Sequence, residues 1–290
     1  MSIKPETIKL LRQKTGAGMM DCKKALSENE GDIEKAEEWL RKKGINTAQK
    51  KSSRLATEGL INVATGKKGS VIVEINSETD FVARNETFQK FCDDVANTCL
   101  EYEVKDKDLL LKSNFINSDT LVETELTNVI AKLGENIVIK RLNYFSEPGL
   151  FYQKYLHNAI SPNSGKIGVL LSFSAEDNGK DVESFTKQLC MHIAAADPLL
   201  MDIKSLSPDV VEKERLIFSE QVKSSGKPEN IIEKIVEGKI KKFYSEVCFL
   251  EQTFVIDNKT IIKDCIANFN KDTGLNFSVN NFLVYKLGQD

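Results

Sequence analysis

The stretch around which the chain is organised is Thr79-Asp80-Phe81-Val82-Ala83-Arg84-Asn85. Before it, apolar residues alternate over 71–75 and predict a strand; after it, apolar residues recur at helical spacing over 88–99. The stretch is therefore expected to form a connecting loop between a strand and a helix. The residues alone favour a structural role, in which the aromatic ring enters the core while Thr79 or Asp80 caps the following helix.

Length and charge exclude several classes of protein. A chain of 290 residues can hold two or three modules with a sizeable core. The formal net charge of −3 argues against a main function in binding nucleic acid or an anionic membrane, because those partners select for a basic excess or a basic face. No apolar run approaches membrane-spanning length. Residues 1–5 resemble neither a secretory signal nor a transit peptide, so a cytosolic location is expected.

The residues that usually carry catalysis or hold a metal are sparse. The six cysteines lack close paired spacing, and we expect them to be reduced core residues. His157 and His192 are the two histidines, too few for a zinc site without clustered thiols. Gly16-Ala17-Gly18 lacks the preceding strand that a phosphate-binding loop needs, and the chain contains no nucleophile elbow. We predict no enzyme activity, no catalytic residue, no cofactor and no metal.

Residues 1–45 predict a module of three short helices. Pro5 suits the first turn, Gly16-Ala17-Gly18 ends the first helix, Asp32 caps the third, and Gly44 ends it. Residues 46–58 are rich in positive charge and poor in core residues, which predicts a linker. A nucleic-acid-binding arm is the alternative, but no aromatic residues interleave to stack on bases.

The second helix of this module begins with two methionines. Met19 falls on one apolar stripe with Cys22 and Leu26. Adjacent residues on a helix point about 100° apart, so Met20 cannot share the centre of that stripe. One of the two methionines is therefore expected to be exposed, either as an ordinary surface residue or as a contact to a partner.

From Gly59 onward, a pattern of hairpin, helix, helix and strand occurs twice. The first copy, residues 59–147, has strands at 60–64 and 71–75, helices through 88–99 and 122–133, and a strand at 137–145. The second copy, residues 148–257, has strands at 151–157 and 167–173, a helix that ends at Pro198, a later helix and a strand at 247–256. We therefore predict an α+β fold with two similar subdomains, each with helices against a small antiparallel sheet.

An insertion interrupts the second copy at about 208–244. Pro208 to Lys223 and Glu229 to Tyr244 each predict a helix, separated by a break at Ser224-Ser225-Gly226-Lys227-Pro228. A projecting, coiled-coil-like hairpin is expected. Its apolar residues serve either a seam between its own helices or a surface for self-association, and the pattern favours neither. Residues 258–290 predict a C-terminal module, a short helix followed by an extended end.

Two long motifs stand out in the chain. They are Ser77-Glu78-Thr79-Asp80-Phe81-Val82-Ala83-Arg84-Asn85 and Thr15-Gly16-Ala17-Gly18-Met19-Met20-Asp21-Cys22-Lys23-Lys24-Ala25-Leu26. The first looks like the signature loop of the elongation factor Ts family, and the second resembles that family's amino-terminal signature in order and distance. The resemblance implies a UBA-like module at residues 1–45. It further implies a cytoplasmic bacterial factor that promotes release of GDP and Mg²⁺ from elongation factor Tu, so that GTP can bind. An interaction scaffold without exchange activity is the alternative.

The resemblance also implies roles for particular residues. Thr79, Asp80, Phe81 and Val82 would displace Mg²⁺ from elongation factor Tu. Other contacts to the same partner would come from Arg12, Met19, Met20 and His157. The turn after His157, residues 158–165, is longer than the usual family turn, whereas His192 is expected to be structural. Some family members dimerise through the helical hairpin, which implies a homodimer as a further partner.

Overall fold

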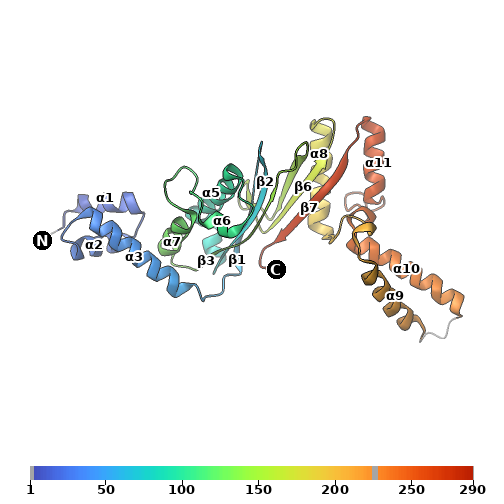
Figure 1. Cartoon of the computed structure of the whole chain (residues 1–290), viewed down its shortest axis with the longest axis horizontal. Helices are drawn as coiled ribbons and strands as arrows, with labels where there is room; N and C mark the ends of the chain where they lie inside the picture. Colours follow the sequence, from blue (N-terminus) through green and yellow to red (C-terminus); the bar gives the residue numbers. More distant parts are fainter. Residues whose placement is uncertain (1–2, 224–227, 290) are drawn as a thin grey trace. The chain divides into compact units, whose positions relative to one another are not determined.

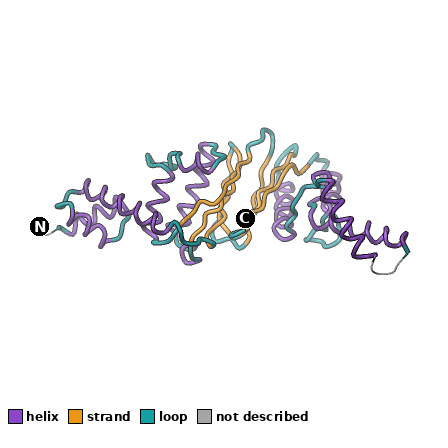
Figure 2. The backbone as a smooth tube through the Cα atoms, turned by 60° about the horizontal axis from the view of Figure 1, so that its bottom comes forward, coloured by secondary structure: helices purple, strands orange, loops and turns teal. Residues whose placement is uncertain are grey.

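The computed structural model describes residues 3–223 and 228–289, and its contacts divide the chain into two units. Unit 1 comprises Met1–Ser146, Asn158–Gly168 and Tyr285–Asp290, and unit 2 comprises Glu147–His157 and Val169–Val284. Both units combine helices with a small sheet, as Figures 1 and 2 show. The prediction of an α+β fold is confirmed.

Three helices form the amino-terminal bundle of unit 1: α1 (Pro5–Thr15), α2 (Met19–Glu28) and α3 (Ile33–Lys51). Their core is fully buried and consists of Leu11, Cys22, Ala25, Leu26 and Ala36. The predicted helix signals act as expected. Gly16 ends α1 in the left-handed conformation (φ 65°), and the Asp32 carboxylate accepts a hydrogen bond from the Lys35 amide at 3.1 Å.

The prediction that Gly44 ends the third helix is wrong. Helix α3 continues through Gly44 to Lys51, so residues 46–51 of the expected linker are helical. Gly44 is buried against α7 (Val122–Leu133), where a Cβ atom in its place would lie 3.5 Å from the Ala131 Cβ. Gly44 therefore lies inside a contact between two helices and does not terminate α3.

The sheet of unit 1 contains β1 (Glu58–Gly66), β2 (Gly69–Ser77), β3 (Ile137–Phe145) and β5 (Ser164–Gly165), in the order β3-β2-β1-β5. All neighbouring strands are antiparallel. Helices α4 (Asp80–Ala83), α5 (Glu86–Tyr102), α6 (Lys107–Leu111) and α7 complete the core. The amphipathic pattern over 88–99 accounts for α5, whose buried face includes Phe88, Cys92 and Val95.

The predicted turn at 158–165 contributes to this sheet. Its last two residues are β5, in which Gly165 pairs with Ile61 and Ser164 with Asn62. The Val63 amide also donates to the Asn163 carbonyl at 2.9 Å. The turn therefore adds a short strand to the β1 edge.

The last residues of the chain pack on the same sheet through a buried ion pair. Glu74 on β2 is fully buried, and its carboxylate accepts a hydrogen bond from Arg141 Nε of β3 at 2.7 Å. The amide of Gly288 donates to the same carboxylate at 3.0 Å, and the Arg141 guanidinium lies 4.1 Å from the Tyr285 ring centroid. Residues 285–288 are thus part of the packing of unit 1.

Unit 2 has a sheet in the order β4-β6-β7, formed by β4 (Phe151–His157), β6 (Ile167–Ser174) and β7 (Ser278–Lys286). Its helices are α8 (Lys180–Ala196), α9 (Pro208–Lys223), α10 (Glu229–Val247) and α11 (Ile262–Thr273), with short 3₁₀ turns η1 (Ile203–Ser205) and η2 (Phe249–Glu251). Helices α9 and α10 pack on each other, with Val222, Val236 and Ile240 buried. Residues 224–227 of the predicted break lie outside the described residues.

The predicted strand at 247–256 is wrong, because α10 extends to Val247 and η2 follows it. Helix α11 and strand β7, within the expected C-terminal module, instead supply the last two elements of the second copy. The correspondence is close: α7 and α11 each have 12 residues and end at left-handed Gly134 and Gly274. In addition, α5 and α8 each have 17 residues, and β3 and β7 each have 9. The element order thus repeats, with α9 and α10 between α8 and α11.

Candidate functional site

Within the stretch 79–85, residues Asp80–Ala83 form a single turn of helix, α4, where a connecting loop was expected. Thr79 is its N-cap, and its hydroxyl accepts a hydrogen bond from the Val82 amide at 3.4 Å. Asn85 then caps α5, accepting from the Thr87 amide at 2.9 Å. Val82 and Ala83 are buried. Caps on both sides and a buried apolar side hold the turn in one conformation.

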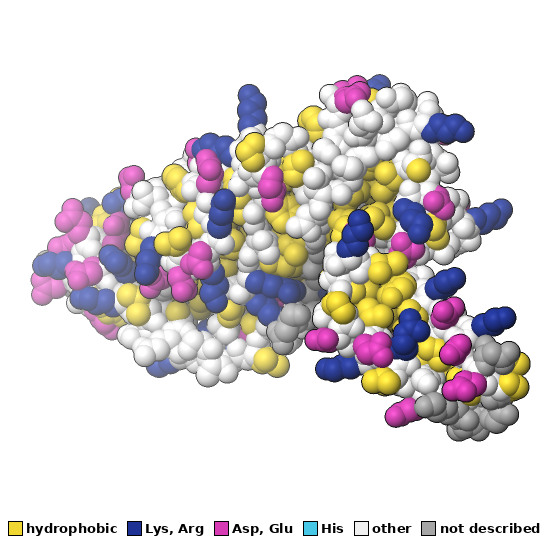
Figure 3. Space-filling view, turned by 45° about the vertical axis from the view of Figure 1, so that its right-hand side comes forward, with side chains coloured by type: hydrophobic (Ala, Val, Ile, Leu, Met, Phe, Trp, Pro, Cys, Tyr) yellow, Lys and Arg dark blue, Asp and Glu magenta, His cyan; other side chains and the backbone are white. Residues whose placement is uncertain are grey.

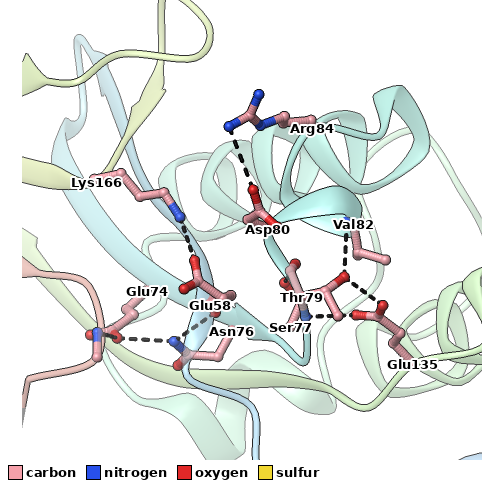
Figure 4. Close-up of polar contacts among 11 residues, drawn as sticks. Glu58, Glu74, Asn76, Ser77, Thr79, Asp80, Val82, Arg84, Glu135 and Lys166 are labelled. Carbon is pink, nitrogen blue, oxygen red and sulfur yellow. Dashed lines mark hydrogen bonds and ion pairs between the residues drawn. The ribbon is translucent and has the colours of Figure 1, made fainter.

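Glu135, between α7 and β3, fixes the beginning of this turn from outside. Its carboxylate accepts one hydrogen bond from the Thr79 hydroxyl at 2.6 Å and a second from the Thr79 amide at 3.0 Å (Figure 4). Both are charge-assisted hydrogen bonds, which are stronger than bonds between neutral groups. Sequence reasoning misses this residue, because nothing near Glu135 in the chain indicates a partner 56 residues away.

A second contact of the same kind involves Glu78. Its carboxylate accepts a hydrogen bond from the Asn136 amide at 2.6 Å and lies 3.4 Å from Arg54. The Asn136 amide is the main cause that lowers the pKa of Glu78 below its usual value, and Arg54 adds to the effect. Glu78 and Thr79 are therefore both tied to the α7–β3 connection by successive residues, Glu135 and Asn136.

Phe81 is 80% exposed, which overturns the interpretation that its ring enters the core. Asp80 also projects, and its carboxylate lies 3.5 Å from Arg84 in an exposed ion pair (Figure 4). The four residues of the predicted site thus divide into two pairs. Thr79 and Val82 hold the turn in place, whereas Asp80 and Phe81 present a charge and an aromatic ring to solvent.

The turn at 158–165 forms a wall beside Asp80. Asn158 and Ile160 line an open depression together with Glu58, Asp80, Arg84 and Lys166. Lys166 Nζ donates to the Glu58 carboxylate at 2.7 Å across it (Figure 4). Ile160 is half-buried against the core of unit 1, which supports the turn.

The predicted contact residues of the bundle are exposed. Met19 is 59% and Met20 74% exposed, so the expectation that Met19 joins the apolar stripe is wrong. The two methionines occupy the first two positions of α2, and burial of that helix begins only at Cys22. Arg12 is exposed near the end of α1.

The two histidines differ in environment. His157 ends β4 and is exposed, with Nδ1 3.2 Å from the Tyr155 hydroxyl. His192 on α8 is fully buried: Nε2 lies 2.9 Å from the Gln252 side-chain oxygen, and Nδ1 accepts a hydrogen bond from the Val255 amide at 3.3 Å. Burial lowers the pKa of His192, because the charged imidazolium loses its hydration. This geometry fits the expected structural role.

We expect unit 2 to lose stability in mild acid through His192. In the unfolded chain the imidazole binds a proton with a pKa of about 6.5, whereas in the folded state burial disfavours protonation. The contribution of neutral His192 to the free energy of unfolding is therefore fully present above that pH. It is lost as the pH falls through and below that value, by at most about 1.4 kcal/mol per pH unit. Urea unfolding of wild type and His192→Asn between pH 5 and 8 checks this. An identical pH slope in the two proteins would contradict it.

The described residues contain no group of three or more His, Cys, Asp or Glu side chains placed to hold a metal ion. All six cysteines are free, and desolvation raises the pKa of the buried Cys99 thiol to about 12, which makes it a poor nucleophile. On the face drawn in Figure 3, acidic and basic side chains are interspersed. The exposed features of 79–85 are a carboxylate and an aromatic ring, which are suited to contact with another molecule.

Every helix among the described residues is too short or too polar to cross a membrane.

Comparisons with known proteins agree with the two motifs. The family model described as "Elongation factor TS" matches residues 78–289, and that described as "Elongation factor Ts, mitochondrial, N-terminal" matches residues 1–51. Elongation factor Ts of Rhodospirillum centenum is 43% identical over 97% of this chain and 92% of its own length. That of Rickettsia felis is 43% identical over 100% and 93%, and that of Gluconobacter oxydans 46% over 87% and 83%. The chain belongs to the elongation factor Ts family.

Proposed function

We propose that this protein is a guanine-nucleotide exchange factor for elongation factor Tu in bacterial translation elongation. It would act in the cytoplasm, bind the GDP-bound partner, promote release of GDP and Mg²⁺, and dissociate when GTP binds. No covalent step is involved. Membership of the family supports this assignment. The single observation that carries it is the exposed Phe81 on a turn whose backbone is held by Thr79 and Glu135.

An exposed aromatic ring on a turn whose backbone is held in place suits displacement of a metal ion in a partner. Mg²⁺ requires near-octahedral oxygen coordination, so small shifts of the surrounding groups cost much of its affinity. Close-packed interiors respond to an inserted ring by repacking into a second arrangement. Phe81 would provide the inserted ring, and Asp80 a carboxylate that disfavours a nearby phosphate and hydrogen-bonds displaced amides. Thr79 and Val82 would keep both side chains in position.

The bundle would supply a second contact to the same partner as a UBA-like docking module. Met19 and Met20 are flexible, apolar and exposed at the start of one helix, a combination that favours a partner groove. Arg12 would add charge to this contact, and His157 at the end of β4 would contact the partner from unit 2. Neither contact requires chemistry, only complementary surfaces.

Binding and release must be coupled in both directions. If the factor lowers the affinity of elongation factor Tu for GDP, GDP must lower the affinity of elongation factor Tu for the factor by the same ratio. The complex is therefore most stable without nucleotide, and GTP dissociates it.

Stopped-flow release of fluorescently labelled GDP from elongation factor Tu tests the proposal. We expect the protein to accelerate release in proportion to its concentration until the partner is saturated. A scaffold without exchange activity would bind elongation factor Tu and leave the release rate unchanged, which would refute the proposal.

We also propose that α9 and α10 support a homodimer. Val210, Leu216 and Ile217 on α9 and Ile231 on α10 are 42–57% exposed, although the seam between the two helices buries other apolar residues. We expect Val210→Asp with Ile217→Asp to weaken self-association about tenfold or more, because a buried, unpaired charge disfavours an interface. Sedimentation velocity measures this, with the exposed Ile256→Asp as a control outside the pair of helices. A monomeric wild type at high concentration would end the homodimer proposal.

A further inference from the structure

Helix α3 belongs to two packed structures at once. Its first half contributes Ala36 to the buried core of the bundle, with Trp39 and Leu40 packed against it. Its second half packs on α7, and Ala48 lies against the core formed by the sheet, α5 and α7. Figure 1 shows α3 as a continuous helix. A contact between α3 and α7 therefore acts directly on the position of the bundle.

Gly44 lies within this contact. An added Cβ would be 3.5 Å from the Ala131 Cβ and 3.8 Å from the Thr127 methyl group, both ordinary van der Waals distances. Alanine therefore fits at position 44. Because Gly44 and Ala131 also line the cleft beside this contact, the further carbons of a larger side chain would press on Ala131 or fill that cleft, and either would alter the fit of α3 on α7. Beyond Gly44, the Lys51 ammonium donates to the Gly134 carbonyl at the end of α7, where a cation is favoured.

Beyond this contact, the bundle approaches α7 at the turn after α1, where a Cβ at Gly16 would lie 3.9 Å from the Lys132 side chain. An open cleft of about 730 Å³ otherwise lies between the bundle and α7, lined on the bundle side by residues such as Gly18, Asp21 and Leu40. Asn128 and Lys132 of α7 line the opposite side. The bundle is thus held mainly through one pair of helices, which makes its position sensitive to a single residue in that pair.

We propose that Gly44 is a positioning residue for partner binding. By letting α3 approach α7, it holds the bundle, with Met19 and Met20, at a fixed distance and direction from Phe81 in the free protein. The inference rests on the proposed function in that both surfaces contact one partner. When one contact has formed, the second is then made at high effective concentration, without the entropy cost of ordering a tethered module.

The first measurement is the position of the bundle in the free protein. A fluorophore pair attached through unnatural amino acids at exposed Lys9 on α1 and Lys107 on α6 reports the distance from the bundle to the core. We expect one narrow distribution for wild type and for Gly44→Ala, the matched control. Gly44→Leu should broaden it or shift it to longer distances. Ala131→Leu adds bulk from the opposite helix and should do the same, so the result does not depend on one variant folding.

The second measurement separates binding from release. We expect Gly44→Leu and Ala131→Leu to weaken binding to nucleotide-free elongation factor Tu about tenfold or more. The maximal rate of GDP release at saturating factor should change less than about twofold, because the turn at 79–85 is untouched. Gly44→Ala should match wild type in both. A general loss of fold would lower both the affinity for elongation factor Tu and the maximal rate of GDP release. A loss of affinity alone therefore identifies an effect on the position of the bundle.

Three outcomes would overturn the inference: a broad distance distribution in wild type, an unchanged distribution in both leucine variants, or displacement of the bundle with no loss of affinity. A wild type that binds elongation factor Tu tightly without accelerating GDP release would refute only the proposed exchange function. In that case the distances and affinities still decide whether Gly44 positions the bundle.

Discussion

Phe81→Ala is expected to reduce the stimulated release of GDP strongly while leaving the thermal transition of the free protein near that of wild type. Truncating a central aromatic side chain at an interface costs about 2 to 4 kcal/mol, which corresponds to roughly thirty- to a thousandfold in equilibrium terms. Only the part of this free energy that is also lost in the transition state of exchange lowers the rate of GDP release. Because the ring is 80% exposed, its loss leaves no cavity in the free protein.

Stopped-flow release at saturating factor and a thermal melt of the free protein test this pair of expectations. Leu109→Ala is a suitable control. Leu109 is 62% exposed on α6, so its truncation also removes exposed apolar surface, but elsewhere in unit 1. A normal release rate in Phe81→Ala would contradict the role of the ring. A large fall in the melting temperature of Phe81→Ala would indicate that the ring is buried and not exposed.

Arg141→Ala is expected to destabilise unit 1 by about 3 to 5 kcal/mol, because it leaves the carboxylate of Glu74 buried and without its cationic partner. Glu74 is fully buried, and Arg141 lies 2.7 Å from it. The Gly288 amide and the Asn76 side chain donate to the same carboxylate, but neither carries a charge. Urea unfolding monitored by circular dichroism measures the effect.

The double variant Glu74→Leu with Arg141→Met is the control for this second prediction. Replacing both members of a buried ion pair by apolar residues removes the unpaired charge, so much of the lost stability should return. The prediction would be contradicted if the double variant were even less stable than Arg141→Ala. In that case the loss of stability in Arg141→Ala would not come from the unpaired charge of Glu74.

Local features of the fold are predictable from sequence. Asp32 caps the start of α3 as expected, and Gly134 ends α7 in the left-handed conformation, because a cap depends on residues within one turn of it. The helices through 88–99 and 122–133 follow from apolar spacing in the same way. The exposed or buried state of Phe81 does not, since one apolar residue between two elements fits both alternatives.

Features that depend on distant residues escape such patterns. Glu135 braces Thr79 from 56 positions away, and its own surroundings give no sign of it. Local rules predict that a helix ends at Gly44, but α3 continues through it and packs against α7 there. The apolar run at 247–256 is compatible with a strand, but the chain buries Phe249 and Phe254 through a 3₁₀ turn and a loop instead. Short apolar runs fit several structures equally well.

The carboxy-terminal segment also has a consequence for folding during synthesis. Strand β7 completes the sheet of unit 2 only once residues 278–286 are available, and Gly288 completes the environment of Glu74 in unit 1. Domains usually fold in order as they leave the ribosome. Residues 278–288 contribute to both units, so neither unit can be completed until this segment has been synthesised. A chain that lacks this segment therefore carries two unfinished units instead of one finished unit and a tail.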